Sequence, residues 1–181
     1  MNEREFAEAM IYLGACTNTT YTKEQLTAWY GHFAPFQREA FIKAIQRHCT
    51  VSRFPPAIAE LKKQLLKLQY PVLNLSAEIE WESVLYAIRK YGRNQIQEAE
   101  KMLHPFTLKI VKMIGGMSLI CQTTDQMSLR HHFIQTFKVI MERYENVLSL
   151  PVSAMNLQER EEKKRILNEI KTEALPLQDL S

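Results

Sequence analysis

Apolar side chains recur every three or four residues along most of this chain, and that period limits the fold more than any other feature. It is the spacing of amphipathic helices, whereas a half-buried strand alternates apolar and polar residues. No such alternation competes with the helical pattern in any segment. Prolines and glycines separate the periodic segments, where they end one helix and start the next. The sequence therefore predicts an all-α protein.

The N-terminal part, residues 1–69, predicts a small bundle of four helices. We expect these helices over residues 3–14, 22–33, 35–49 and 56–69. Gly14 is expected to end the first helix, and Thr22 with Gln25 forms a capping box at the start of the second. A bundle of about 70 residues is close to the lower limit for independent folding and needs bulky core side chains. The expected aromatic core residues are Trp29, Tyr30, Phe33, Phe36 and Phe41.

A second helical domain is expected over residues 77–150, after a linker at 70–76 that lacks periodicity and contains a proline. Its helices are predicted at about 77–91, 94–103, 105–114 and 125–148, and the last of these is the longest element. The first of them carries Ile79, Val84, Ile88 and Tyr91 as its apolar stripe. Residues 151–181 predict a charged helix, at about 155–172, that frays into a flexible tail.

The cysteines and the N-terminal segment indicate the compartment. Cys16, Cys49 and Cys121 are odd in number and form no CxxC motif, so we expect reduced, buried thiols. The chain begins Met-Asn-Glu-Arg-Glu and has no run of about 18 apolar residues, which predicts neither a signal peptide nor a membrane span. A cytoplasmic protein without a membrane partner is therefore expected.

The sequence contains none of the usual patterns for a phosphate loop or a zinc site. The paired glycines at 115–116 are followed by Met-Ser rather than Lys-Ser, so they do not form a phosphate-binding loop. The neighbours His48-Cys49 and His131-His132 would point about 100° apart on a helix and could not bind one ion from the same face. We expect these histidines at the surface or at its boundary.

Acidic residues and thiols also have structural explanations. Glu78, Glu80 and Glu82 begin a predicted helix, where negative charge complements the helix dipole. The cysteines lie among apolar neighbours, where a thiolate is disfavoured. We therefore predict no catalytic residue, no metal and no cofactor: the protein is not an enzyme and acts by binding other macromolecules.

One basic and aromatic cluster could contact nucleic acid. Arg53 and Phe54 precede two prolines, and Lys62, Lys63 and Lys67 follow on the fourth predicted helix. Cations next to an aromatic ring suit the phosphates and bases of a nucleic acid. A solvated polar helix face explains the lysines equally well. The net charge of +3 permits a DNA contact without arguing for one.

Two segments of the N-terminal part carry a family resemblance. They are Leu26-Thr-Ala-Trp29-Tyr30 and, some 25 residues later, Arg53-Phe-Pro-Pro-Ala-Ile-Ala-Glu-Leu61. This pattern resembles the replicative-helicase loader and inhibitor family of phages that infect Gram-positive bacteria, over residues 3 to about 68. The second half looks like a companion segment of such phage replication proteins. Its matching positions are Trp81, Tyr91-Gly92, Pro105, Ile114-Gly115-Gly116, Phe133 and Tyr144.

The resemblance implies a small helical protein that binds a hexameric DnaB-type helicase in the host cytoplasm. It would keep the helicase from acting prematurely and hand it to an origin-binding initiator protein, without an ATPase of its own. Because this chain is longer than the family and has a second helical half, which segment binds the helicase stays open. The candidate partner-binding residues are Arg53, Phe54, Lys62, Lys63 and Lys67, with Leu175, Leu177 and Leu180 near the C-terminus.

Two alternatives remain open. One is a DNA-binding replication or regulatory protein that contacts phosphates through Arg53 and the fourth helix, with an affinity that falls steeply as salt rises. The other is a structural or assembly protein of a phage, which would form stable self-oligomers without any effect on a helicase.

Overall fold

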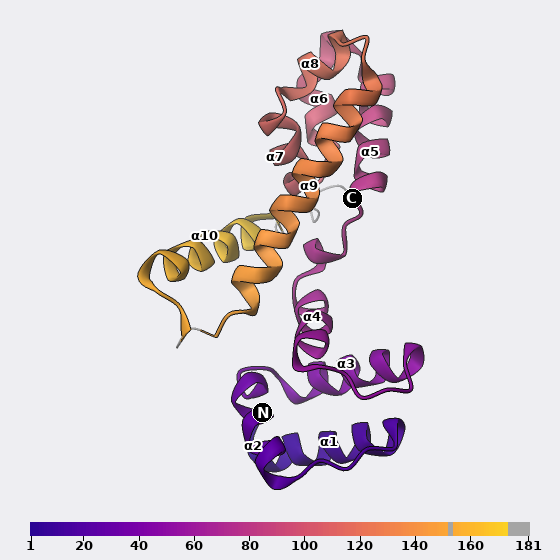
Figure 1. Ribbon diagram of the computed structural model, residues 1–181. Helices are drawn as coiled ribbons and strands as arrows, with labels where there is room; N and C mark the ends of the chain where they lie inside the picture. The colour runs from indigo at the N-terminus through magenta and orange to yellow at the C-terminus, as the bar shows by residue number, and fades with distance from the viewer. Residues whose placement is uncertain (152–153, 174–181) are drawn as a thin grey trace, which may run out of the picture. The chain divides into compact units, whose positions relative to one another are not determined.

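The computed structural model describes residues 1–151 and 154–173, which form α-helices and short 3-10 helices and contain no strand (Figure 1). The prediction of an all-α protein is confirmed. The described chain divides into two compact units. Unit 1 comprises Met1–Pro71 with Leu148–Met155, and unit 2 comprises Val72–Val147 with the chain from Asn156 onward. None of the described helices is long and apolar enough to cross a membrane.

Unit 1 is built on four short helices around one core. They are α1 (Glu3–Thr17), α2 (Lys23–Phe33), α3 (Arg38–Val51) and α4 (Ile58–Gln69). Phe33 and Phe41 are fully buried with ring centroids 4.9 Å apart, and Phe6 lies 5.4 Å from Phe41. Of the aromatic core predicted from the sequence, Trp29, Tyr30 and Phe36 are only partly buried and pack against this centre.

The first helix does not end at Gly14, and this expectation was wrong. It continues to Thr17 and is closed by Asn18 in the left-handed conformation, with φ 51°. Gly14 has another reason to be glycine. The chain turns back so that the amide of Thr19 donates to the Gly14 carbonyl at 2.9 Å, and a Cβ at Gly14 would lie 2.4 Å from the Thr19 carbonyl oxygen.

The second helix starts as predicted. The Gln25 amide donates to the Thr22 hydroxyl at 3.3 Å, and the Thr22 amide donates to the Gln25 side chain at 2.9 Å, which completes the capping box. The third and fourth helices begin at Arg38 and Ile58, two or three residues after the prolines that were expected to open them.

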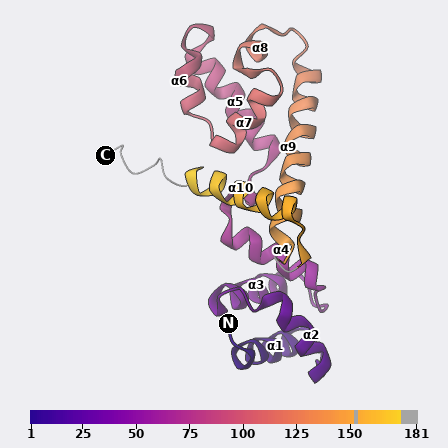
Figure 2. The ribbon, with the colours of Figure 1, turned by 90° about the vertical axis from the view of Figure 1, so that its left-hand side faces the viewer.

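Unit 2 contains six α-helices in its described part. They are α5 (Ala77–Tyr91), α6 (Ile96–Lys101), α7 (Pro105–Met113), α8 (Gly116–Gln122), α9 (Gln126–Ser149, of which the last two residues count with unit 1) and α10 (Leu157–Glu173). Short 3-10 helices lie at Pro71–Asn74, within the segment expected as a linker, and at Arg93–Gln95. Two views show α5 to α8 gathered along the first part of α9 (Figure 2). Trp81, Phe106, Phe133 and Phe137 form the aromatic centre.

The buried face of α5 differs from the predicted stripe. Ile79 is 66% exposed, whereas Glu80, Trp81 and Val84 are buried. The face is turned because the Glu80 carboxylate accepts a short hydrogen bond from the buried Thr107 hydroxyl of α7. Glu80 therefore does more than complement the helix dipole. Its hydrogen bond to Thr107 occupies the buried face of α5 where apolar periodicity had predicted Ile79.

The thiols are less buried than expected. Cys16 is exposed, and Cys49 and Cys121 are half-buried. Burial, together with the neighbouring Cys16 thiol, raises the pKa of Cys49 to about 11. The Cys49 thiol therefore stays protonated near neutral pH.

Candidate functional site

The segment that carries the predicted contact residues Arg53 and Phe54 is an exposed loop between α3 and α4. The Phe54 side chain is 65% exposed. The Arg53 guanidinium lies 5.2 Å from the centroid of the Phe54 ring, in cation–π geometry. The loop therefore presents an aromatic ring and a cation to solvent together.

Two hydrogen bonds hold the backbone of this loop. The Nε2 atom of His48 lies 2.8 Å from the Phe54 carbonyl oxygen, and because a carbonyl only accepts, Nε2 carries the proton. The Phe54 amide in turn donates to the Ser52 hydroxyl at 3.1 Å. His48 was expected at the surface or at its boundary, but only 8% of it is exposed, so it lies inside unit 1. Its ring has the structural role of anchoring an exposed aromatic side chain.

The exposed face of α3 extends the loop into a ridge. Lys43, Arg47 and Val51 follow one another at four-residue spacing, which places them along one side of the helix, and all three are exposed. Val51 is 79% exposed. We call Lys43, Arg47, Val51, Arg53 and Phe54 the α3 ridge. Its three cations form no ion pair within the described chain.

The three lysines of α4 do not share one exposed face, contrary to expectation. Lys63 is exposed, while Lys62 and Lys67 are half-buried. The Lys62 ammonium donates to the carbonyl of Ser149, in the same unit, at 3.0 Å, and burial lowers its pKa. The remaining predicted residues, Leu175, Leu177 and Leu180, and the expected flexible tail lie outside the residues that the structure describes.

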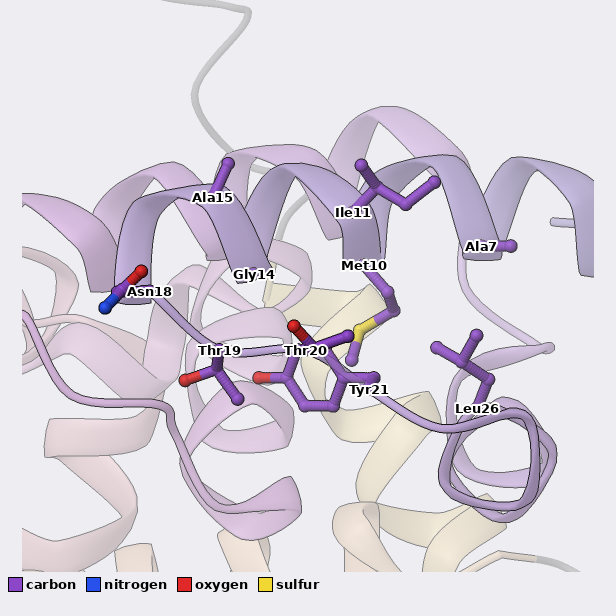
Figure 3. A pocket seen from close by; sticks show the side chains of 10 residues that line it. All are labelled: Ala7, Met10, Ile11, Gly14, Ala15, Asn18, Thr19, Thr20, Tyr21 and Leu26. Carbon is purple, nitrogen blue, oxygen red and sulfur yellow. The ribbon is translucent and has the colours of Figure 1, made fainter.

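A hollow of about 380 Å³ lies beside α1, against the loop that leads to α2 (Figure 3). Met10 and Tyr21 face one another across it, and Leu26 lines it from α2. Ile11, on the rim, is 72% exposed. None of the ten lining residues is charged. The hollow therefore offers neither a cation for a phosphate nor a carboxylate for a metal ion.

Sequence periodicity could have found part of this surface. Lys43 and Arg47 stand four residues apart among the apolar positions of the third predicted helix, which places both on its polar face. Val51 stands four residues after Arg47 and so continues their row, which is the signal that was missed. The hollow beside α1 had no such signal, because it is formed where the chain turns back at Asn18.

Unit 1 thus has an uncharged hollow beside α1 and, on the α3 ridge, exposed aromatic and arginine side chains, which are residue types enriched at protein interfaces. Residues 1–62 match the family model for the N-terminal domain of the phage SPP1 helicase loader and inhibitor. The predicted resemblance to the phage helicase loader and inhibitor family is thereby confirmed over this part of the chain. The match includes the α3 ridge and the hollow and covers about one third of the chain. Neither curated proteins nor solved structures gave a match.

Proposed function

We propose that this protein binds a hexameric DnaB-type replicative helicase through unit 1, restrains it, and delivers it to an origin-binding initiator in the cytoplasm of the host cell. The match of residues 1–62 to the N-terminal domain of the phage helicase loader and inhibitor supports a function of the helicase-loader type. The sequence has no phosphate-binding loop, so any work on the helicase would come from binding energy and from the nucleotide turnover of the helicase itself.

The observation that carries this proposal is the α3 ridge. Aromatic and arginine side chains are enriched at the centres of protein interfaces, where a few of them supply most of the binding energy. Phe54 and Arg53 are such a pair, and the Phe54 backbone is already held by His48 and Ser52. A preformed loop loses little conformational freedom on binding, so more of its contact energy is available as affinity.

Restraint and delivery need no chemistry from this chain. A protein that binds one conformation of a helicase more tightly than another shifts the helicase toward that conformation. An initiator that binds a different face of the same complex can then collect it. Loader and inhibitor are thus two outcomes of one preferential binding event.

The test uses the full chain and a DnaB-type helicase in size-exclusion chromatography, with ATPase and unwinding rates measured on the same mixture. We expect co-elution and altered rates. Phe54→Ala should weaken binding by about tenfold or more, as truncation of an interface aromatic does. Tyr86→Ala is the matched control, because Tyr86 is an aromatic residue of unit 2 that is 52% exposed. Separate elution with unchanged rates contradicts the proposal.

The alternative function is DNA binding, which the unpaired cations of the α3 ridge favour. Lys43, Arg47 and Arg53 could contact successive phosphates, with Phe54 against a base. The signature would be an affinity for DNA that falls steeply with salt and does not require any helicase.

A further inference from the structure

Helix α10 packs within unit 2 through a short apolar stripe, in which Ile166 is buried and Leu167 and Ile170 are half-buried. It is dominated by charged side chains, and Leu157 at its start is 79% exposed. Ile166 is its one fully buried side chain among those described, at 1% exposure. A helix this polar does not stay in place through hydrophobic burial alone, so its charged contacts must position it.

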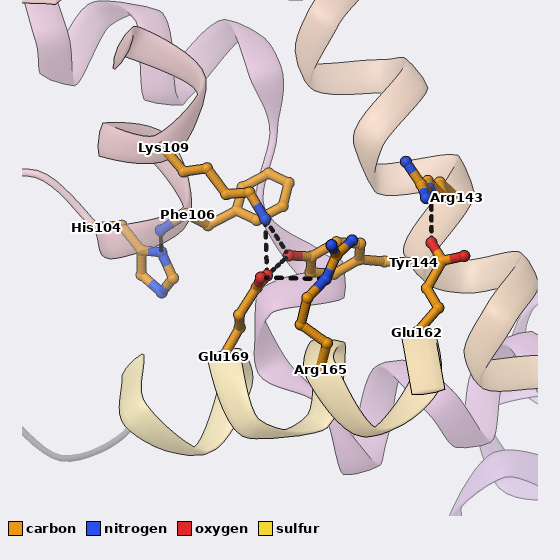
Figure 4. Close-up of polar contacts among 8 residues, drawn as sticks. All are labelled: His104, Phe106, Lys109, Arg143, Tyr144, Glu162, Arg165 and Glu169. Carbon is orange, nitrogen blue, oxygen red and sulfur yellow. Dashed lines mark hydrogen bonds and ion pairs between the residues drawn. The ribbon is translucent and has the colours of Figure 1, made fainter. Parts of the chain in front are cut away.

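The first charged contact joins α10 to both α7 and α9. The Lys109 ammonium of α7 donates to the Glu169 carboxylate at 2.7 Å and to the Tyr144 hydroxyl of α9 at 2.9 Å. The Tyr144 hydroxyl donates to the same carboxylate, and Arg165 lies 3.8 Å from it (Figure 4). Burial raises the pKa of Glu169, but the hydrogen bonds from Lys109 and Tyr144 outweigh burial and lower it.

The second charged contact lies two turns earlier on α10. Arg143 of α9 forms a short ion pair with Glu162, which is drawn beside the first contact in Figure 4. Glu162, Ile166 and Glu169 are spaced i, i+4 and i+7, so they form one stripe along α10. The surface below them therefore recognises a helix by two carboxylates with an apolar side chain between them.

That surface does not depend on α10 for its own support. The Tyr144 ring meets the edge of Phe106 at 5.4 Å, and Phe106 meets Phe137 at 5.0 Å, all within α7 and α9. Lys109 lies 5.3 Å from the Tyr144 ring centroid. Water still reaches the ion pair, because Lys109 and Glu169 remain 35% and 31% exposed. Ion pairs open to water are weak and exchange easily.

We propose that α10 is a releasable arm of unit 2, and that the surface it leaves, centred on Lys109, Arg143 and Tyr144, binds an acidic amphipathic helix of a partner protein in its place. The partner helix would carry two carboxylates and an apolar residue at the spacing of Glu162, Ile166 and Glu169. This is helix-in-groove recognition, with the chain's own helix as the competing ligand. It is independent of what unit 1 binds.

Release of the arm is tested by limited trypsin cleavage of the full chain. Arg160, Lys163 and Lys164 are cleavage sites within α10. The double variant Glu162→Gln, Glu169→Gln should be cut in α10 about tenfold faster than the wild type, while α5–α9 stay resistant, because local opening controls cleavage. Glu161→Gln is the matched control, since its carboxylate pairs with Lys164 of the same helix. If the double variant and the wild type are cut in α10 at equal rates, or if α5–α9 are cut at the same time as α10, then α10 is not a releasable arm.

Binding of a partner helix is tested with a fluorescent peptide of residues 156–173. The peptide is titrated onto the full chain and onto the full-chain variant Ile166→Asp, in which the arm has lost its apolar anchor. We expect the variant to bind at least about tenfold more tightly, because the arm no longer competes. A peptide carrying Glu162→Gln and Glu169→Gln should bind neither chain. Absence of peptide binding to an Ile166→Asp chain that trypsin shows to be released refutes the docking surface.

Discussion

Two glycines lie inside helices of unit 1, and only one of them is required by its surroundings. Gly14 is buried, and its Cα faces the Thr19 carbonyl oxygen, a backbone atom that cannot rotate away. Gly31 of α2 has nothing within 4 Å of the place where a Cβ would stand. The same substitution should therefore act in opposite directions at the two positions.

We predict that Gly14→Ala lowers the free energy of unfolding of unit 1 by about 1–3 kcal/mol, the cost of forcing an atom into a packed site. Gly31→Ala should raise it by about 0.5–1 kcal/mol, because alanine loses less backbone entropy in a helix than glycine. Urea denaturation followed by circular dichroism measures both. Equal effects of the two variants would mean that the close approach at Thr19 does not constrain α1.

The hydrogen bond between the Thr107 hydroxyl and the Glu80 carboxylate is buried in the core of unit 2. Thr107 is fully buried, so its hydroxyl is a hydrogen-bond donor to Glu80 that water cannot replace. Thr107→Val keeps the shape and removes that donor, and it should destabilise unit 2 by about 1–3 kcal/mol. Thr50→Val is the control, because the Thr50 hydroxyl is exposed and its loss should change stability by less than about 0.5 kcal/mol. Similar losses in the two variants would contradict the role assigned to Thr107.

The hydrogen bond between Glu80 and Thr107 is an example of a contact that could not be predicted from the sequence. Apolar periodicity places Ile79 inside and Glu80 outside, and it cannot account for a carboxylate that finds a donor 27 residues away. His48 is a similar case, since its buried position depends on the Phe54 carbonyl that the following loop brings back to it. Both residues are positioned by contacts that form only after the helices pack.

At the scale of elements, the long and strongly periodic helices were predictable, and so were two of the breaks between them, since α5 ends at Tyr91 and α7 begins at Pro105. Thr22 and Gln25 carry a local signal, and α2 begins where that signal stands. Helix α8 was missed because two glycines stand at its start, Gly115 as the N-cap and Gly116 as the first helical residue, and only Met117 and Ile120 are buried within its seven residues. Both glycines have positive φ, at 114° and 82°, so they turn the chain into a new helix rather than a loop.

Helix α10 is the element whose position should depend on pH. The pKa of Glu169 is lower in the folded protein than its ordinary value of 4.5, so the unfolded chain binds this proton more tightly. The resulting stability is complete above the unfolded pKa and is lost as pH falls through the folded pKa. Lys109 on α7, Tyr144 on α9 and Arg165 on α10 face the carboxylate.

We therefore predict that the α10 amides are less protected from hydrogen exchange at an acidic pH below 4.5 than at neutral pH, and that they lose this protection earlier than the α9 amides as pH falls. Exchange rates corrected for the intrinsic effect of pH, measured by NMR, test this. Glu169→Gln should show weak protection of α10 at both pH values and a smaller difference between them. Protection of α10 that follows α9 through the whole range would show that the arm unfolds only with the rest of unit 2.

At the scale of the whole molecule, charge is divided unequally between the two units. Unit 1 has nine Lys and Arg against six Asp and Glu, and unit 2 has 14 of each, so the net charge of +3 belongs to unit 1. Three of the unit 1 cations form the α3 ridge beside Val51 and Phe54. A net positive charge of this size can accelerate association with an acidic protein surface and can also attract phosphates. Variants of the ridge can therefore distinguish helicase binding from DNA binding.

Two double variants of the ridge distinguish a helicase from DNA as its partner. Lys43→Glu with Arg47→Glu reverses the charge, and Val51→Ser with Phe54→Ser removes the apolar contacts of two side chains that are mostly exposed. For a protein partner, the Val51→Ser, Phe54→Ser variant should lose at least about tenfold in affinity, because aromatic side chains supply much of the binding energy at interfaces. For single-stranded DNA, the Lys43→Glu, Arg47→Glu variant should lose more affinity, and the slope of log affinity against log salt should become shallower by about 0.7 for each phosphate contact removed. Titrations of both variants with a DnaB-type helicase and with single-stranded DNA, each at several salt concentrations, give the answer. Two results together would show that the ridge binds DNA and not the helicase. The Lys43→Glu, Arg47→Glu variant would lose DNA affinity and its salt dependence, and the Val51→Ser, Phe54→Ser variant would keep full helicase affinity.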